Sequence, residues 1–150
     1  MRGYWGDAKS TEESFYIRPS DGSKWYRTGD VASIDSKGWV VVSHRVKDVI
    51  KVKGFQVSPA ELESLLFQHP KVQDVAVCGI FKDAEKTMQA PWAFVVASSD
   101  KPDKDLEQEL LNATNAQLTE YKRIQGITWL EALPKSASGK VLKKDLVAAF

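Results

Sequence analysis

The chain has 150 residues, a length that suits one domain of ordinary size or one small domain with an appendage. Hydrophobic residues make up 43% and charged residues 27%, which is typical of a folded globular protein and excludes a disordered one. The net charge of +1 excludes a general electrostatic attraction to nucleic acid or to an anionic membrane, so any basic patch must be local.

The cysteine count and the hydropathy argue against a disulfide-stabilised, secreted or membrane-spanning protein. The single cysteine, Cys78, lies in an apolar run, so we expect a buried thiol and no intrachain disulfide. No segment approaches the roughly 20 apolar residues of a membrane span. The first residues lack the apolar core of a secretory signal, and the final AAF is not a peroxisomal address. We therefore expect a soluble, cytoplasmic protein.

The first third of the chain predicts turns and hairpins. Residues 1–22 are polar and rich in glycine, a composition that indicates irregular structure. The runs VASID (31–35) and WVVVSHR (39–45) predict two strands that the turn signal DSKG joins into a hairpin. The runs VIKVK and FQV, on either side of Gly54, predict a second hairpin.

The remaining two thirds alternate between helix and strand patterns. The clearest helix is predicted over 58–70, with Ser58 as N-cap, Pro59 at the first helical position and Glu61 completing a capping box. Strands are predicted over 72–81 and 90–98, and the second is apolar enough to be central in its sheet. A helix over 101–118, a strand over 126–133 and a short helix over 142–150 follow. This order predicts an α+β domain from about residue 47 onward.

The segment PKSASGK (134–140) places Lys140 behind small, flexible residues, as in a phosphate-holding loop. It is not a P-loop, because Pro134 stands where the first glycine belongs and Val141 replaces the hydroxyl residue after the lysine. Two interpretations stay open. The segment is either a solvated turn or a mobile tether that carries a lysine to a phosphate.

Two further polar clusters are candidate anion or nucleotide sites. In YRTGD (26–30), Asp30 could accept hydrogen bonds from a ribose diol, or it could simply belong to a turn. Four cations are spaced so that an extended chain would place them on one face: Arg45, Lys47, Lys51 and Lys53. Such a face fits phosphates, with Gly54 allowing close approach, but lysines also protect edge strands. The sequence shows no metal-ligand spacing and no Ser-His-Asp arrangement.

Taken in order, six segments resemble the C-terminal third of the adenylate-forming (AMP-binding) enzymes: GYWGDAKSTEESF, WYRTGD, GWVVVSHRVKDVIKVKGFQVSPAELE, HPKVQDVAVCGI, APWAFVV and LPKSASGK. That superfamily includes acyl-CoA synthetases, 4-coumarate–CoA ligases, firefly luciferase and nonribosomal peptide adenylation domains. The run IKVKGFQVSPAELE is most similar to the 4-coumarate–CoA ligase and luciferase branch. The resemblance extends over essentially the whole chain.

The resemblance implies a domain organisation. Residues 1–46 would be the β-hairpin end of the large N-terminal AMP-binding domain. Residues 47–150 would be the small C-terminal lid, an α+β fold with a β-hairpin, a sheet of roughly three strands and flanking helices. The phosphate loop, acyl pocket and adenine site of the large domain are not in this sequence, so we expect a fragment or truncated product that is inactive alone.

The resemblance also implies a two-step reaction. A carboxylate attacks ATP to give acyl-AMP and pyrophosphate, and a thiol, usually that of CoA, then attacks the acyl-AMP. The small domain rotates between the steps. The implied cofactors are ATP/AMP and CoA, with Mg²⁺ accompanying ATP but without ligands in this chain. The implied partners are a carboxylic acid and the N-terminal AMP-binding domain.

Residue roles are carried over by position. Lys140 would bridge the substrate carboxylate and the α-phosphate in the first step, and Lys51 and Gln56 would face the active site in the second. Asp30 would hold the ribose hydroxyls of ATP, and Arg45 the ribose or phosphates. Lys47 would be the hinge, and three residues would lie along the pantetheine path: Lys53, Gly54 and Phe55.

Two alternatives stay open beside a CoA ligase. The chain could belong to an adenylating domain whose acceptor is a carrier protein or another group, or it could be a non-catalytic interaction domain that reuses the lid fold. The wording of the hairpin KVKGFQVSPAELE favours CoA.

Overall fold

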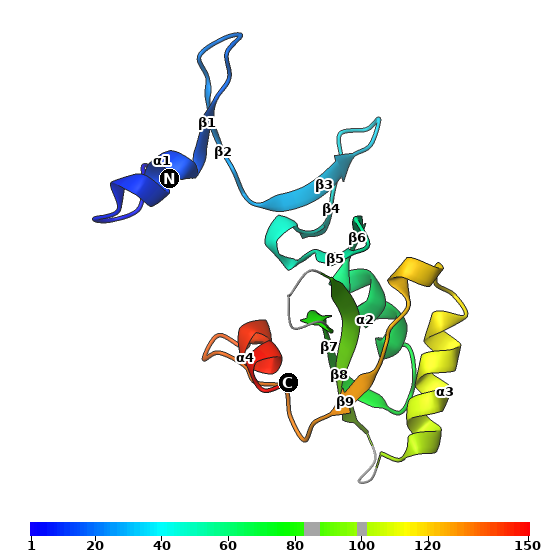
Figure 1. Cartoon of the computed structure of the whole chain (residues 1–150). Helices are drawn as coiled ribbons and strands as arrows, with labels where there is room; N and C mark the ends of the chain where they lie inside the picture. The colour runs from blue at the N-terminus through cyan, green and yellow to red at the C-terminus, as the bar shows by residue number, and fades with distance from the viewer. Residues whose placement is uncertain (83–87, 99–101) are drawn as a thin grey trace. The chain divides into compact units, whose positions relative to one another are not determined.

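The computed structural model describes residues 1–82, 88–98 and 102–150 (Figure 1). The chain forms two compact units, Met1–Lys47 and Asp48–Phe150. Each unit is described by itself below.

The first unit consists of a short helix and two hairpins. Helix α1 (Ala8–Glu13) precedes the antiparallel pair β1 (Phe15–Ile17) and β2 (Lys24–Tyr26). Strands β3 (Asp30–Ile34) and β4 (Val40–Arg45) form the second antiparallel pair, as the sequence predicts. The 3₁₀ turn η1 (Val46–Asp48) ends this part of the chain.

The prediction of irregular structure over residues 1–22 is wrong for α1 and β1. The side chain of Asp7 caps α1 by accepting a hydrogen bond from the Ser10 N–H at 2.9 Å. The helix buries no residue, so it has no apolar stripe from which it could be predicted. A local cap, rather than packing, accounts for the helix.

The first unit has no buried side chain. Large apolar residues are instead exposed in it, with 101% of Trp5 and 71% each of Ile34 and Trp39 accessible. Two-stranded hairpins are marginal in water without a packed face. The apolar surface of this unit therefore lacks the partner that such hairpins normally have.

The second unit is built around one sheet of three strands. Strand β8 (Gln89–Ala97) lies between β7 (Val72–Phe81), to which it is antiparallel, and β9 (Ile127–Trp129), to which it is parallel. The predicted central position of the second apolar strand is confirmed. A separate hairpin of β5 (Ile50–Val52) and β6 (Phe55–Val57) precedes the sheet in sequence, also as predicted.

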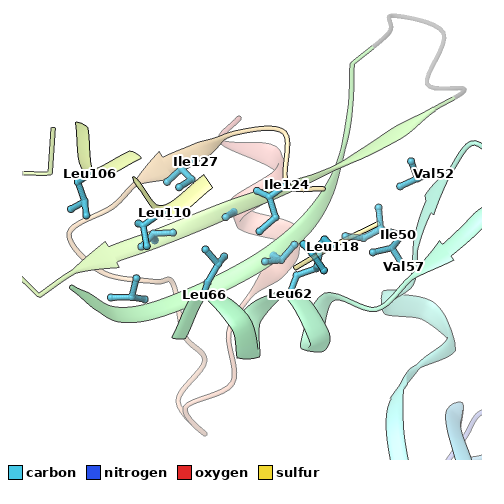
Figure 2. Close-up of a cluster of buried hydrophobic side chains, with 14 residues drawn as sticks. Ile50, Val52, Val57, Leu62, Leu66, Leu106, Leu110, Leu118, Ile124 and Ile127 are labelled. Carbon is cyan, nitrogen blue, oxygen red and sulfur yellow. The ribbon is translucent and has the colours of Figure 1, made fainter. Parts of the chain in front are cut away.

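Helices cover both faces of the sheet. Helices α2 (Pro59–Phe67) and α3 (Lys104–Asn115) contribute leucines to a cluster that includes Val77, Ala93 and Val95 from the sheet and the hairpin residues Ile50, Val52 and Val57 (Figure 2). Helix α4 (Lys143–Ala148) places Leu146 in a second cluster with Ala76, Cys78, Phe94 and Val96. Neighbouring strand residues point to opposite faces, so the two clusters lie on opposite sides of the sheet.

The predicted capping box of α2 is wrong. Ser58 is in the N-cap position, but its side chain makes no capping hydrogen bond. Glu61 does not turn back to the helix start, because both of its carboxylate oxygens accept from Lys122 Nζ, at 2.7 and 2.9 Å. Lys122 belongs to the 3₁₀ turn η2 (Glu120–Lys122), so the ion pair ties α2 to the segment that leads to β9.

The turn between β5 and β6 contains two residues with left-handed backbone, Lys53 with φ 46° and Gly54 with φ 85°. A two-residue hairpin turn with positive φ at both positions is most favourable for Asn-Gly. A lysine in this region carries backbone strain of about 1–2 kcal/mol that asparagine reduces. Lys53 thus holds a position where another residue would be more stable.

We expect Lys53→Asn to raise the free energy of unfolding by about 0.5–1 kcal/mol, because asparagine adopts positive φ at lower cost. Urea denaturation of the chain measures this change. Gly54→Ala is the matched control. It should lower stability by about 1 kcal/mol, since open space surrounds its Cβ and only the backbone strain remains. A destabilised Lys53→Asn variant would contradict the assignment of strain.

The Cys78 thiol is buried in the cluster beneath α4, as expected, and this burial raises its pKa to about 11. Since the ordinary value is 9.0, the reactive thiolate at pH 8 should be about 100-fold scarcer than in the unfolded chain. We therefore expect modification by Ellman's reagent to be at least that much slower in buffer than in denaturing urea. Similar rates in the two conditions would show that the thiol is accessible.

Candidate functional site

Asp30 and Arg45 lie opposite each other in the β3–β4 hairpin. Arg45 Nε is 3.1 Å from Asp30 Oδ1, and the Asp30 side chain is only 25% exposed. The turn before β3 supports this carboxylate, because the Asp30 N–H donates to Thr28 Oγ1 and the Val46 N–H donates to the Gly29 carbonyl. The first unit thus presents a carboxylate and a guanidinium side by side, a pair suited to hydroxyl and phosphate groups.

The four cations predicted to share one strand face do not lie on one continuous strand. The 3₁₀ turn η1 interrupts the chain at Lys47, and Lys53 lies in the hairpin turn, not in a strand. Arg45 and Lys47 belong to the first unit, whereas Lys51 and Lys53 belong to the second. The periodicity argument failed because it assumed one continuous extended segment. Lys47 is the last residue of the first unit.

Lys51 and Gln56 form a cross-strand pair on the β5–β6 hairpin. Both side chains are exposed, and the next residues along the strands, Val52 and Val57, are buried in the core. The Lys51 N–H also donates to Gln89 Oε1 at 2.9 Å, which ties the hairpin to the start of β8. The hairpin therefore presents an ammonium and an amide together on a fixed, solvent-facing surface.

A groove of about 620 Å³, here called the hairpin groove, runs beside this hairpin. Three cations face it, with one carboxylate at its rim, and its walls include two aromatic rings. Its lining residues are Val52, Lys53, Phe55, Lys82, Met88, Gln89, Ala90, Pro91, Glu120, Tyr121, Arg123 and Gln125. Cations around an apolar floor suit an elongated ligand that carries both phosphates and uncharged segments.

The aromatic wall of the groove is fixed by contacts from two directions. Phe55 stacks on Tyr121 with ring centroids 4.4 Å apart and an interplanar angle of 19°. The bidentate Glu61–Lys122 ion pair holds the residue next to Tyr121. The groove is therefore formed by the hairpin on one side and by η2 on the other.

Lys140 ends a closed, hydrogen-bonded turn. The Ser136 N–H donates to the Lys140 carbonyl and the Gly139 N–H to the Ser136 carbonyl, both at 2.8 Å, while the Lys140 N–H donates to Ser136 Oγ at 3.2 Å. Gly139 adopts φ 80°, which the turn requires. Of the two interpretations left open by the sequence, these bonds show the turn, and a mobile tether stays a prediction.

The Lys140 side chain is exposed and has no hydrogen-bond or ion-pair partner among the residues that the structure describes. The flanking lysines differ. Lys135 Nζ lies 2.6 Å from Asp74 Oδ2, and Lys143 Nζ lies 2.7 Å from Glu63 Oε1. Of these three lysines, Lys140 is thus the one whose charge is available to a ligand.

The structure separates the predicted site residues of the second unit into two groups. Five of them lie on the hairpin that packs into the α2–α3 cluster: Lys51, Lys53, Gly54, Phe55 and Gln56. Lys140 lies instead on the turn that leads into α4, and its neighbour Val141 packs against the cluster on the other face. Figure 1 shows this turn, in orange and red, well apart from β5 and β6.

Sequence reasoning missed four residues of the hairpin groove and of the Lys140 surroundings: Tyr121, Arg123, Glu63 and Lys143. The first two follow α3 in the run EYKR, whose basic pair was a usable signal that was not followed. The other two are 80 positions apart, so no spacing rule could have brought them together.

No membrane-crossing helix is found in the described part of the chain. Over the same residues there is no group of three or more His, Cys, Asp or Glu side chains arranged to hold a metal ion.

Curated relatives share the whole length of this chain. It is 44% identical over 148 residues to 4-coumarate–CoA ligase 1 of Glycine max, which covers 99% of the chain and 48% of the relative. It is 42% identical to 4-coumarate–CoA ligase of Pinus taeda, with coverage of 97% and 25%. The peroxisomal OPC-8:0-CoA ligase 1 of Arabidopsis thaliana is 39% identical, with coverage of 98% and 25%. The chain thus spans a quarter to a half of these relatives.

Solved structures agree in fold. The anthranilate CoA ligase AuaEII in complex with anthranoyl-AMP aligns with a TM-score of 0.80 and 30% identity, over 98% of this chain and 27% of that one. ATP-bound MatB from Rhodopseudomonas palustris aligns with a TM-score of 0.82 and 30% identity, over 99% and 28%. The anthranoyl-AMP and the ATP in these names are ligands of those two solved structures.

The family comparison is specific to the second unit. The model of the AMP-binding enzyme C-terminal domain matches residues 61–140, more than half of the chain. The matched range includes all but the first two residues of α2, the three-stranded sheet, α3 and the Lys140 turn. On this match, and with the α+β fold that the solved relatives share, the chain belongs to the AMP-binding enzyme C-terminal domain family of the adenylate-forming enzymes.

Proposed function

We propose that this chain supplies the C-terminal part of an ATP-dependent carboxylate–CoA ligase, with the second unit as its mobile catalytic lid. The observation that carries the proposal is Lys140, an exposed and unpaired cation on a closed turn between two paired lysines. The named activities of the relatives, which are CoA ligases, support the reaction class.

In the first step, a carboxylate oxygen of the substrate attacks the α-phosphorus of ATP. The bond from that phosphorus to the bridging oxygen breaks, and pyrophosphate leaves with the electron pair. Negative charge gathers between the carboxylate and the α-phosphate in the transition state. The Lys140 ammonium can lie there and stabilise this charge. Asp30 would accept hydrogen bonds from the ribose hydroxyls, and Arg45 would contact the ribose or phosphates.

In the second step, the CoA thiol would release its proton to solvent and its sulfur would attack the carbonyl carbon of acyl-AMP. The bond from that carbon to the phosphate oxygen breaks, and AMP leaves with the electron pair. Lys51 and Gln56 form the exposed polar pair that would face the reacting groups. The hairpin groove would hold part of the CoA molecule, with Lys53, Lys82 and Arg123 near its phosphates. Gly54 and Phe55 would line the pantetheine path.

The Lys140 turn and the β5–β6 hairpin fit a lid that presents a different surface to the active site in each step. Lys140 and the hairpin belong to structural layers on opposite faces of the sheet, so each step would use its own orientation of the lid. We assign the hinge to Lys47, the last residue of the first unit. The exposed apolar hairpins of residues 1–46 would be the end of the preceding large domain and would pack on it.

The proposal assigns no residue of this chain to binding Mg²⁺ or to the pocket for the carboxylic acid. ATP would enter with Mg²⁺, and the carboxylic acid would bind in the large domain, which the longer relatives have room to supply. A cytoplasmic location stays a prediction, because one relative is named as peroxisomal.

Two substitutions separate the steps in a chimera in which this chain replaces the matched quarter of the Pinus taeda ligase. Lys140→Ala should slow pyrophosphate release with 4-coumarate and ATP by about 100- to 1,000-fold, because it removes charge stabilisation from the first transition state. Attack of CoA on supplied 4-coumaroyl-AMP should be preserved. Lys51→Ala should show the reverse pattern.

The control for both variants is Lys144→Ala, which removes an exposed lysine next to the paired Lys143 and should affect neither step. Equal impairment of one half-reaction by Lys140→Ala and Lys51→Ala would refute the division of roles. An inactive chimera with the unmodified chain would count against the proposed function itself.

The 150-residue chain alone should give no ATP–pyrophosphate exchange with a panel of carboxylic acids. The reason is that the proposal places the binding pocket for the acid in the large domain. Isotope exchange with labelled pyrophosphate is the measurement, and the chimera serves as the positive control. A clear signal from the chain alone would show that the large domain is dispensable.

A further inference from the structure

The free edge of β7 carries a closed polar network. Glu63 Oε1 accepts hydrogen bonds from the Val77 N–H at 2.8 Å and from Lys143 Nζ at 2.7 Å. Lys143 Nζ also donates to the Val77 carbonyl at 3.1 Å. The two side chains therefore supply the acceptor and the donor that a neighbouring strand would otherwise provide.

This network satisfies a real structural requirement. Within the described residues, β7 has a partner strand only on the side of β8. Val77 is itself buried, so its N–H and carbonyl would be left without partners if both side chains were removed. Glu63 and Lys143 are 25% and 32% exposed, which limits screening of their charges by water.

The ion pair connects helices on opposite faces of the sheet. Glu63 belongs to α2, whose Leu62 and Leu66 pack in the α2–α3 cluster. Lys143 is the first residue of α4, whose Leu146 packs in the other cluster. The pair passes around the edge of the sheet at Val77 and fixes one helix against the other.

The start of α4 has no side-chain cap. Helix α4 has six residues, and its N-cap position, Leu142, makes no side-chain capping bond. A helix this short has no stability of its own, and a lysine in its first turn opposes the helix dipole. The contacts of Lys143 with Glu63 and Val77 therefore add to the burial of Leu146 in fixing the start of α4.

The same network lies three residues from Lys140. On the opposite arm of the turn, Lys135 is held by Asp74 near the start of β7, and Lys135 forms a β-bridge with Val141. The Leu142 N–H donates to the Pro134 carbonyl at 2.8 Å, which joins the two arms. One arm is thus fastened to β7 by the Lys135–Asp74 pair, and the other is fastened to α2 by the Lys143–Glu63 pair and to β7 by the Lys143 bond to the Val77 carbonyl.

We propose that Glu63 and Lys143 are positioning residues for Lys140: by joining α2 to α4 across the free edge of β7, they fix the turn that presents the Lys140 ammonium. The inference rests on the proposed function of Lys140 and adds residues that touch no substrate. It predicts that weakening the pair slows only the step in which Lys140 acts.

The positioning is tested first on the chain itself by ¹⁵N relaxation. In Lys143→Met, the backbone order parameters of residues 136–140 should fall from about 0.85 to below about 0.6, while those of β8 stay unchanged. Lys144→Met is the matched control and should change neither. Lys143→Arg should restore order, since arginine can still pair with Glu63. Glu63→Gln keeps an acceptor for the Val77 N–H and should therefore keep the fold. It should lower the order parameters of the turn less than Lys143→Met does.

An unchanged turn in Lys143→Met would overturn the proposal. An equal loss of order in the turn and in β8 would also overturn it, because the pair would then be a general stabiliser. Neither result depends on catalysis.

The catalytic consequence is tested in the chimera. Lys143→Met should slow pyrophosphate release at least about tenfold through kcat, and change CoA attack on supplied 4-coumaroyl-AMP less than about twofold. Equal slowing of both steps would refute a role in positioning Lys140. If Lys140→Ala itself leaves the first step unchanged, the proposed function fails, and the relaxation data still decide whether the pair orders the turn.

Discussion

Burial of the three-stranded sheet on both faces is the constraint on which the rest of the second unit depends. Because α2 and α3 cover one face and α4 the other, the polar groups of the sheet must be satisfied along its edges. The edge of β7 is closed by Glu63 and Lys143, and the start of β8 is tied to the hairpin through Gln89. Functional candidates are consequently found on turns and edges, whereas the interior is devoted to packing.

In the second unit, buried residues hold the structure, and exposed residues on turns and edges are the candidates for chemistry. The hairpin that carries Lys51 and Gln56 buries Ile50, Val52 and Val57, so its exposed residues are held by the core. The turn that carries Lys140 buries less, with Val141 packed against the second cluster, and lysine–carboxylate pairs add to its support at both ends. The proposed lid role would require surfaces that keep their shape while the domain moves, and both kinds of contact suit that requirement.

The sequence predicted most of the second unit because its elements follow simple periods. Alternation and apolar runs located β7 and β8, and the leucines of α2 located the main helix. Failures came where a local or distant interaction replaces a period. Asp7 caps a helix that buries nothing, Lys122 draws Glu61 away from its capping role, and η1 breaks a segment that looked continuous. The hairpin groove depends on Tyr121 stacking on Phe55, a contact across 66 positions that no pattern reveals.

The lack of a core in the first unit affects how unfolding of this chain would be observed. Every buried hydrophobic side chain lies at or after Ile50 within the described residues. Three of the five tryptophans, however, are in the first unit: Trp5, Trp25 and Trp39. Intrinsic fluorescence is therefore dominated by indoles that are already in water, and it would under-report the loss of the folded sheet. Trp92 and Trp129, which are partly buried and pack against the two clusters, are the indoles that sense the packed domain.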